Sequence, residues 1–193
     1  DYGIGPKPVF DGADSAYNSR FAFDPSFTNL YGISWTNDFR DNTDVSQLSV
    51  WENGQRLVRA ASKAACDARA GSYWPKTTTQ SGGTDSIYVH ASNSSNVTTN
   101  GFLYEITSRP MGLQVRDGCK IYNMHTRRNG SNDGSIKTGH NAYVQGVLAE
   151  DGVKHNFFMS SGTAENCIAW KCDSAFSGGT TMFVSYTESP DAD

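Results

Sequence analysis

The chain lacks a long apolar run. No stretch of it approaches the roughly 18–20 apolar residues that a membrane-spanning helix requires. It also lacks an excess of positive charge, because 16 Lys and Arg residues against 20 Asp and Glu residues give a formal net charge of 16 − 20 = −4. Contacts to phosphate favour a basic face, so nucleic-acid binding is not expected to be the main task. The sequence therefore predicts neither a membrane nor a nucleic acid as a partner.

A signal-like start and a zinc motif are missing as well. The N-terminal residues Asp1–Pro6 include no initiating Met and no apolar signal segment, which predicts a mature, processed or partial piece of a larger protein. No two of the four cysteines lie two to four residues apart, as they would in a zinc ribbon. This leaves two alternatives, which are buried free thiols and a bridge such as Cys119 to Cys167. The cysteines are Cys66, Cys119, Cys167 and Cys172.

Long segments with helical periodicity are also absent, and 19 glycines indicate a β protein with many turns. From Gly112 onward, β-prone runs of three to five residues are separated by Gly, Asn, Ser, Asp or His. Strands this short at such spacing indicate the coils of a β-solenoid, or else a sandwich. The runs are Leu113–Val115, Cys119–Tyr122, Ala142–Val144, Asn156–Met159, Cys167–Trp170 and Met182–Tyr186.

The first half contains clearer local signals. Asn53-Gly54 separates two β-prone runs, residues 48–52 and 55–59, which predicts a hairpin with a type I′ turn. Ser62 as N-cap and Gly71 as terminator predict a short helix between them. A strand is expected at residues 30–35. A second hairpin is expected to pair residues 86–90 with residues 102–106.

The order of these elements resembles a known superfamily. The residues that carry the resemblance are Gly3-Ile4-Gly5-Pro6-Lys7-Pro8-Val9, the hairpin from Val50 to Leu57, Gly71-Ser72-Tyr73-Trp74, Ile87-Tyr88-Val89-His90, Tyr104 to Arg109 and Gly112-Leu113-Gln114-Val115. The pattern is similar to the right-handed parallel β-helix proteins of the pectin-lyase-like superfamily, which include bacteriophage tailspikes and secreted polysaccharide lyases and hydrolases. The resemblance implies an all-β chain, a right-handed parallel β-helix (solenoid) with an inserted hairpin-and-helix subdomain.

That fold divides the chain into three parts. The first β-helix coils are expected in residues 1–47, the inserted subdomain in 48–109, and further coils, continuing beyond the chain, in 110–193. Strands from Gly112 onward are predicted to be parallel and stacked about 4.8 Å apart. The side chains expected to point inward are Leu113, Val115, Ile121, Val144, Val147, Phe158, Ile168 and Val184.

One tetrad recurs in the second half. Asp117-Gly118-Cys119-Lys120 returns as Asp151-Gly152-Val153-Lys154, at an offset of 151 − 117 = 34 residues. Stacked coils would place Asp117 and Asp151 together as a carboxylate pair. The alternative is that each Asp closes a corner turn through its own backbone.

Acids and bases are densest between residues 140 and 155. Glycoside hydrolysis needs two carboxyl groups, whereas eliminative cleavage of a uronate needs a base and a group that holds the developing charge. Adjacent coils would bring His140 and His155 within a few ångströms, although half-exposed structural histidines are the alternative. The predicted catalytic residues are His140, Glu150, Asp151, Lys154 and His155.

Aromatic side chains are the expected substrate-binding groups, because sugar rings stack on them through their C–H faces. The candidates are Trp51, Trp74 and Tyr143, and the alternative is that these rings belong to the core. No cofactor is predicted, and calcium in the loop Asn129–Ser135 is the alternative. The loop Asn129–Ser135 resembles part of a calcium loop, but it lacks the bidentate Glu that such a loop requires.

The sequence therefore predicts a carbohydrate-directed protein, as a polysaccharide lyase or glycoside hydrolase in a phage tailspike or secreted enzyme. The alternative is a non-catalytic structural or adhesive protein of a virion or cell surface. The expected partners are a polysaccharide or cell-surface glycan. Sister chains of a homotrimer, or flanking coils of the same protein, are expected to cover the apolar ends of the coils. The expected location is extracellular or on a virion.

Overall fold

The computed structural model describes residues 6–36, 48–76, 84–109, 111–130, 134–152, 155–171, 174–183 and 186–189. The chain divides into two compact units. Unit 1 comprises Asp1–Gly12 and Arg109–Asp193, and unit 2 comprises Ala13–Ser108. In the described residues, the one α-helix has five residues, and no helix is long and apolar enough to cross a membrane.

The prediction of a right-handed parallel β-helix with an inserted subdomain was wrong. The chain is all-β, but its described strands form four separate sheets, and parallel strands dominate only those of unit 1. Strands expected in the first coils, β2 (Ala13–Ala16) and β4 (Tyr31–Thr36), pair antiparallel with strands of unit 2 instead. The described residues therefore contain no single long solenoid. The physical reason is visible in β4 and β9, where buried apolar residues alternate with small or polar ones, a pattern that suits an antiparallel sheet with one buried face.

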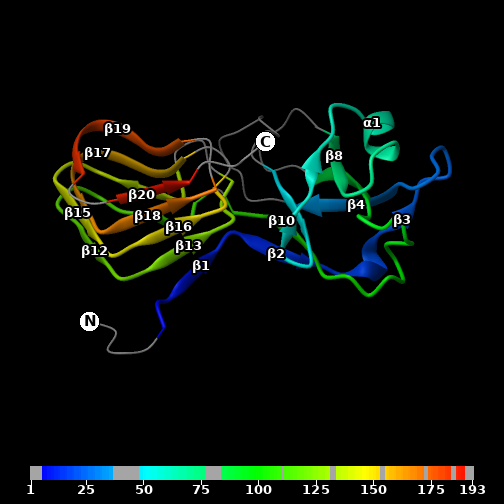
Figure 1. Ribbon diagram of the computed structural model, residues 1–193, viewed down its shortest axis with the longest axis horizontal. Helices are drawn as coiled ribbons and strands as arrows, with labels where there is room; N and C mark the ends of the chain where they lie inside the picture. The colour runs from blue at the N-terminus through cyan, green and yellow to red at the C-terminus, as the bar shows by residue number, and fades with distance from the viewer. Residues whose placement is uncertain are drawn as a thin grey trace. The chain divides into compact units, whose positions relative to one another are not determined.

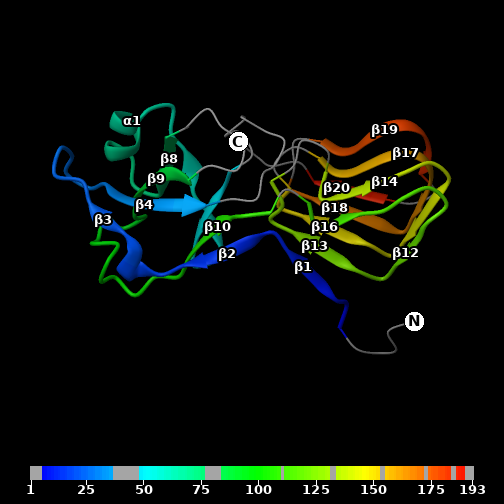
Figure 2. The same cartoon turned by 180° about the vertical axis from the view of Figure 1, so that it is seen from behind.

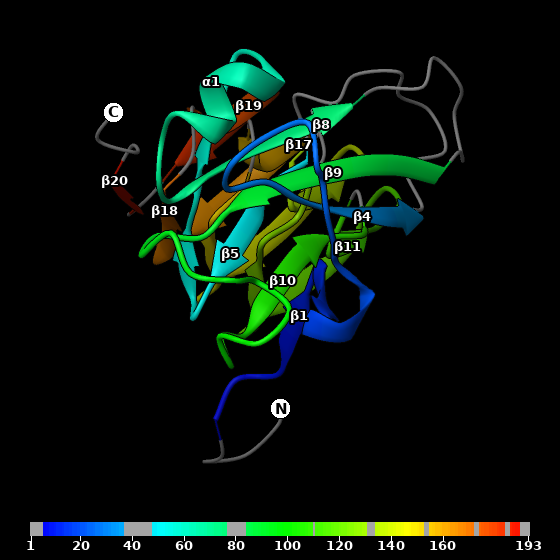
Figure 3. The ribbon, with the colours of Figure 1, turned by 90° about the vertical axis from the view of Figure 1, so that its right-hand side faces the viewer.

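Unit 2 contains two sheets. One has the strand order β2-β10-β5-β6, and the other has the order β3-β4-β9-β8-β7. The remaining bounds are β3 Ala22–Phe23, β5 Val50–Glu52, β6 Gln55–Arg56, β7 Val58–Arg59, β8 Ser72–Lys76, β9 Thr84–His90, β10 Tyr104–Thr107, the 3-10 helix Asn18–Arg20 and α1 Lys63–Asp67. Figure 3 shows β4, β8 and β9 side by side near α1.

Three local predictions in unit 2 are confirmed. Asn53 and Gly54 have positive φ values of 50° and 78°, and they join β5 to β6 in an antiparallel hairpin. The hydroxyl of Ser62 caps α1 by accepting a hydrogen bond from the N–H group of Ala65 at 3.1 Å. A strand occupies the segment expected at residues 30–35, as β4. The prediction that residues 86–90 pair with residues 102–106 in a second hairpin was wrong. β9 pairs with β4 and β8, while β10 pairs with β2 and β5.

Unit 1 contains two sheets in which every described pairing is parallel. One has the order β1-β13-β16-β18-β20, which Figure 1 labels as a series of neighbouring ribbons. The other has the order β11-β14-β17-β15-β12, and β19 also pairs with β17. It curls because β17 pairs with β14 along its first half and with β15 along its second half. Figure 2 shows β14, β17 and β19 from the other side.

The bounds in unit 1 are β1 Val9–Asp11, β11 Leu113–Gln114, β12 Lys120–Tyr122, β13 His125–Arg127, β14 Ile136–Thr138, β15 Ala142–Gln145, β16 Leu148–Glu150, β17 His155–Glu165, β18 Cys167–Trp170, β19 Ser174–Phe183 and β20 Tyr186–Ser189. Some predicted coil residues fall within unit 1 and others within unit 2. The strands β2, β3 and β4 belong to unit 2 with residues 48–108.

The core of unit 1 contains most of the predicted inward side chains. Ile121, Val144 and Val147 are buried, and Leu113 and Val115 are partly buried against them. Two positions differ from the prediction by one residue, which is enough to reverse the face of a strand. Phe157 is buried where Phe158 was expected, and Ile168 is 41% exposed between the buried Cys167 and Ala169. Val184 lies outside the described residues.

Three cysteines are free thiols, namely Cys66, Cys119 and Cys167. Burial raises the pKa of the thiols of Cys66 and Cys167. Cys172 lies outside the described residues.

Candidate functional site

The two predicted catalytic histidines are not brought together. His140 is exposed in the turn after β14, and its Nδ1 atom lies 3.3 Å from the hydroxyl of Ser161 on β17. His155 begins β17, and its carbonyl oxygen accepts a hydrogen bond from the N–H group of Ser135 at 3.2 Å. Ser161 follows His155 by 161 − 155 = 6 positions on one strand. At about 3.3 Å per residue, the two histidines lie on the order of 15–20 Å apart.

The carboxylate pair expected from Asp117 and Asp151 does not form. Glu150 faces His125 of β13, with 2.9 Å between Oε1 and Nε2. Asp151 has a positive φ of 53° in the turn after β16, and its N–H group donates to the carbonyl oxygen of Trp170. Asp117 accepts a hydrogen bond from the N–H group of His140 at 2.7 Å. Asp117 and Asp151 therefore occupy different turns, while Lys154 lies outside the described residues.

Of the predicted substrate-binding aromatics, Trp51 is only 1% exposed, so its ring belongs to the interior. Tyr143 is half-buried beside Tyr122, with ring centroids 5.8 Å apart, and its hydroxyl donates to Glu165. This hydrogen bond, burial and the charge of Glu165 raise the pKa of Tyr143 to about 12. Trp74 is half-buried, with its ring centroid 5.7 Å from that of Tyr88.

An open depression, which we call the cavity, lies beside Tyr88 on the outer face of the five-stranded sheet of unit 2. The alternation of side chains along each strand places Ile33 and Ile87 in the core. It therefore leaves Gly32, Ser34, Ser86 and Tyr88 on the outer face. Gly32 lies directly opposite Tyr88, and Ser34 lies directly opposite Ser86. The sheet thus supplies a floor of small residues.

The cavity has a volume of about 360 Å³. Phe23, which is 49% exposed, and Pro25 give it an apolar wall. The side chains of Asp24, Ser34 and Ser86 supply polar groups. The described residues that line it are Ala22, Phe23, Asp24, Pro25, Gly32, Ile33, Ser34, Ser86 and Tyr88.

An ion pair neutralises the charge at the cavity wall. The ammonium group of Lys63 on α1 donates to the carboxylate of Asp24. It also lies over two aromatic rings, 3.7 Å from the centroid of Tyr88 and 4.9 Å from that of Phe27. The hydrogen bond from Lys63 lowers the pKa of Asp24, and the N–H group of Ser26 lowers it further. Burial alone would lower the pKa of Lys63, but its bond to Asp24 raises that pKa on balance.

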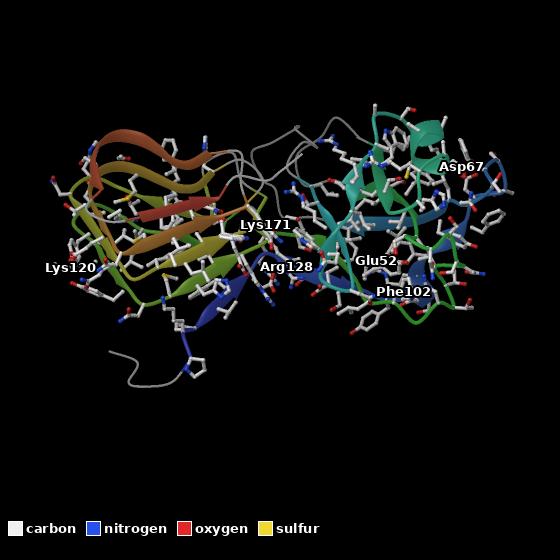
Figure 4. All side chains as sticks on the ribbon, viewed as in Figure 1. Glu52, Asp67, Phe102, Lys120, Arg128 and Lys171 are labelled. Atoms are coloured by element: carbon white, nitrogen blue, oxygen red, sulfur yellow. The ribbon has the colours of Figure 1, made fainter. Side chains whose placement is uncertain are left out.

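The loop that carries this wall is anchored at two points. Asp24 accepts a hydrogen bond from the N–H group of Ser26 at 3.0 Å, which closes the turn after β3. Asp67 at the end of α1 accepts from the N–H groups of Thr28 and Asn29, at 3.0 and 2.7 Å. Figure 4 labels Asp67 where α1 approaches the loop after β3. The wall is therefore held in place without a ligand.

Sequence reasoning named Trp74 next to this cavity but missed its lining. Gly32, Ser34 and Ser86 carry the available signal, since small residues alternate there with buried apolar ones. The contribution of Phe23 and Asp24 depends on how the loop after β3 folds back, which the local sequence does not specify.

The described residues contain no group of three or more His, Cys, Asp or Glu side chains that could hold a metal ion. Part of the calcium-like loop, residues 131–133, lies outside the described ranges.

No protein-family model matches the chain, and no curated protein matches its sequence. One solved structure, the complex of XylC with xylose, resembles it with a TM-score of 0.51 and 7% sequence identity. The similarity covers 88% of this chain and 42% of that protein, so this chain spans well under half of its length. At this identity the similarity concerns the fold. The resemblance to the pectin-lyase-like superfamily stays a prediction.

Proposed function

We propose that this protein binds a neutral carbohydrate in the cavity of unit 2. The observation that carries the proposal is the combination of an exposed ring, Phe23, with the polar side chains of Asp24, Ser34 and Ser86 around one small-residue floor. An aromatic ring offers a surface for the C–H face of a sugar. Hydroxyl and carboxylate groups at its edge can exchange hydrogen bonds with the sugar hydroxyls.

The charges at the wall favour a neutral ligand. A cationic ligand would have to displace Lys63, which already occupies the carboxylate of Asp24 and the face of Tyr88. Because Lys63 and Asp24 neutralise each other, the wall carries no net charge that would attract an anionic ligand. A volume of about 360 Å³ falls at the lower end of the range for small-molecule sites, so it suits one or two sugar units.

The structure of XylC was solved with xylose, which supports xylose and xylo-oligosaccharides as the first probes. Polysaccharide cleavage and an extracellular or virion location stay predictions. The proposal concerns binding in this cavity, and the predicted catalytic residues His140, Asp151 and His155 belong to unit 1.

The test is a binding screen of the full chain against immobilised neutral and acidic polysaccharides, followed by titration with xylohexaose. Phe23→Ala removes the exposed wall, and Tyr17→Ala removes a 70% exposed ring that does not line the cavity. We expect Phe23→Ala to weaken binding roughly three- to tenfold and Tyr17→Ala to leave it unchanged. Equal binding by both variants and wild type, or no binding to any glycan, would contradict the proposal.

A further inference from the structure

The outer face of the β1-β13-β16-β18-β20 sheet in unit 1 carries an organised row of side chains. Parallel register places Arg127 of β13 opposite Glu150 of β16, and Glu150 opposite Trp170 of β18. Their neighbours in sequence, Ala149 and Ala169, are fully buried. Because side chains alternate between the faces of a strand, the row itself points outward. Neighbouring members are one strand spacing apart, about 4.8 Å.

Each member of the row keeps part of its surface accessible. Trp170 is 42% exposed, and the side chains of Arg127 and Glu150 are 41% and 26% exposed. The adjacent Ile168, two positions before Trp170 on the same strand, is 41% exposed and extends the apolar surface. An indole of this exposure beside a carboxylate and a guanidinium is not explained by the core of unit 1.

The polar groups of the row are held in place by neighbouring side chains on the same face of the sheet, Asp11 opposite Arg127 and His125 two positions before Arg127 on β13. His125 lies 2.9 Å from Glu150 through Nε2 and Oε1, which fixes the carboxylate. The Nε atom of Arg127 donates to Asp11 at 2.8 Å, and Asp11 is also bound by Arg128, whose side chain is 8% exposed. Figure 4 labels Arg128 among these side chains. The row is therefore preorganised, which lowers the entropy cost of binding a ligand.

We propose that the row Arg127–Glu150–Trp170 is a second carbohydrate-binding surface, which takes the flat face of an extended neutral polysaccharide. The inference rests on the proposed function, since it assumes the same class of ligand, but it concerns a different unit and different residues. Trp170 stacks on a sugar ring, while Glu150 accepts from the sugar hydroxyls and Arg127 donates to them. Arg127 and Glu150 carry opposite charges side by side, so together they add no net charge that would attract an anionic chain. The face is open, so a polymer can contact more of it than a monosaccharide and should bind with higher affinity.

The indole N–H signals of the four tryptophans separate the two sites in one NMR experiment. Trp170 reports on the row and Trp74 on the neighbourhood of the cavity, whereas Trp35 and Trp51, 4% and 1% exposed, serve as buried controls. Isotope-labelled full chain is titrated with xylohexaose and with a panel of soluble neutral polysaccharides. Trp170→Phe assigns the signal of the row. We expect the Trp170 signal to shift with a polymer and Trp170→Ala to weaken polymer binding roughly three- to tenfold.

The outcomes distinguish the two proposals. A shift of Trp170 without Trp74 supports the row and contradicts the cavity, and the reverse supports the cavity and overturns the row. Tyr122→Ala, which removes a 44% exposed ring from the other sheet of unit 1, is the matched control and should bind like wild type. If Trp170→Ala proves unstable, Glu150→Ala must weaken polymer binding instead. A Trp170 signal that responds only to protein concentration would identify a self-association face and overturn the inference.

Discussion

The carboxylate of Asp67 at the end of α1 accepts a hydrogen bond from the backbone N–H group of Asn29 at 2.7 Å. The same Oδ1 atom accepts from Thr28 at 3.0 Å, so one side chain of α1 fixes the loop that carries Phe23 and Asp24. The wall of the proposed sugar site thus depends on a contact outside the cavity.

Removing this anchor should weaken binding without removing a ligand contact. We expect Asp67→Ala to reduce affinity roughly fivefold, about 1 kcal/mol, because the loop must then be ordered when the sugar binds. Asp67→Asn keeps the accepting oxygen and should bind nearly as wild type. Calorimetric titration with the best glycan of the screen measures both variants. Equal losses of affinity in Asp67→Ala and Asp67→Asn would show that the charge of Asp67, rather than its hydrogen bonds to the loop, matters.

The floor of the cavity offers a second test. A Cβ atom on Gly32 would lie 3.0 Å from Cε1 of Tyr88, closer than ordinary van der Waals contact. Gly32→Val places a branched side chain there, which we expect to lower affinity at least tenfold by filling the cavity, about 1.4 kcal/mol. Because the ring of Tyr88 must move to admit this side chain, the midpoint of thermal unfolding is measured as well, to show that the variant is folded. Retained affinity in a folded Gly32→Val variant would place the ligand elsewhere.

Much of unit 2 could be predicted locally. Asn53-Gly54 and the Ser62 cap depend on neighbours within a few residues, and both are confirmed. The partner of β9 is a longer-range choice. Residues 86–90 and 102–106 look alike as hairpin arms, but β9 completes the alternating face of β4 while β10 joins β2 and β5. The fold prediction extended the parallel pattern of unit 1 to residues 1–47, whose strands β2 and β4 pair antiparallel within unit 2 instead.

The exposure and proximity of the predicted site residues also depend on long-range pairing, which the local sequence does not specify. Trp51 and Trp74 are equivalent as aromatic residues in the sequence, yet only the structure shows that Trp51 is 1% exposed while Trp74 is half-buried. His140 and His155 occupy neighbouring runs, but His155 begins β17 whereas His140, in the turn after β14, contacts Ser161 six positions further along that strand.

Glu52 provides a prediction about stability. Its buried carboxylate, labelled in Figure 4, accepts hydrogen bonds from the hydroxyl of Tyr104 at 2.8 Å and from the hydroxyl and N–H groups of Ser92. Glu52→Gln turns an acceptor into a donor that faces these donors. We expect the free energy of unfolding to fall by about 2–3 kcal/mol, measured by urea denaturation. Glu105→Gln, at a half-buried position of the same sheet, should lower the free energy of unfolding by less. An equal loss in both variants would contradict the role of Glu52 as a buried hydrogen-bond acceptor.

Tyr143 predicts a pH dependence at the alkaline end. Its pKa is raised from the ordinary 10.0 to about 12 by its bond to Glu165, so the folded state favours the protonated phenol. This contribution is complete below pH 10.0 and is lost as the pH rises towards about 12. Tyr143→Phe should remove that part of the pH dependence of unfolding. If the free energy of unfolding of Tyr143→Phe depends on pH between 10.0 and about 12 as it does in wild type, Tyr143 is not the source of that dependence.

The most direct test of the proposed function maps a neutral oligosaccharide onto the folded chain. Backbone amide NMR signals are followed during titration with xylohexaose, or with the neutral glycan that the screen selects. Binding in the cavity predicts saturable shifts at Gly32, Ser34 and Ser86, which Phe23→Ala weakens and Tyr17→Ala does not. Saturable binding that leaves these three signals unmoved, or no binding to any neutral glycan, would contradict carbohydrate recognition by this cavity.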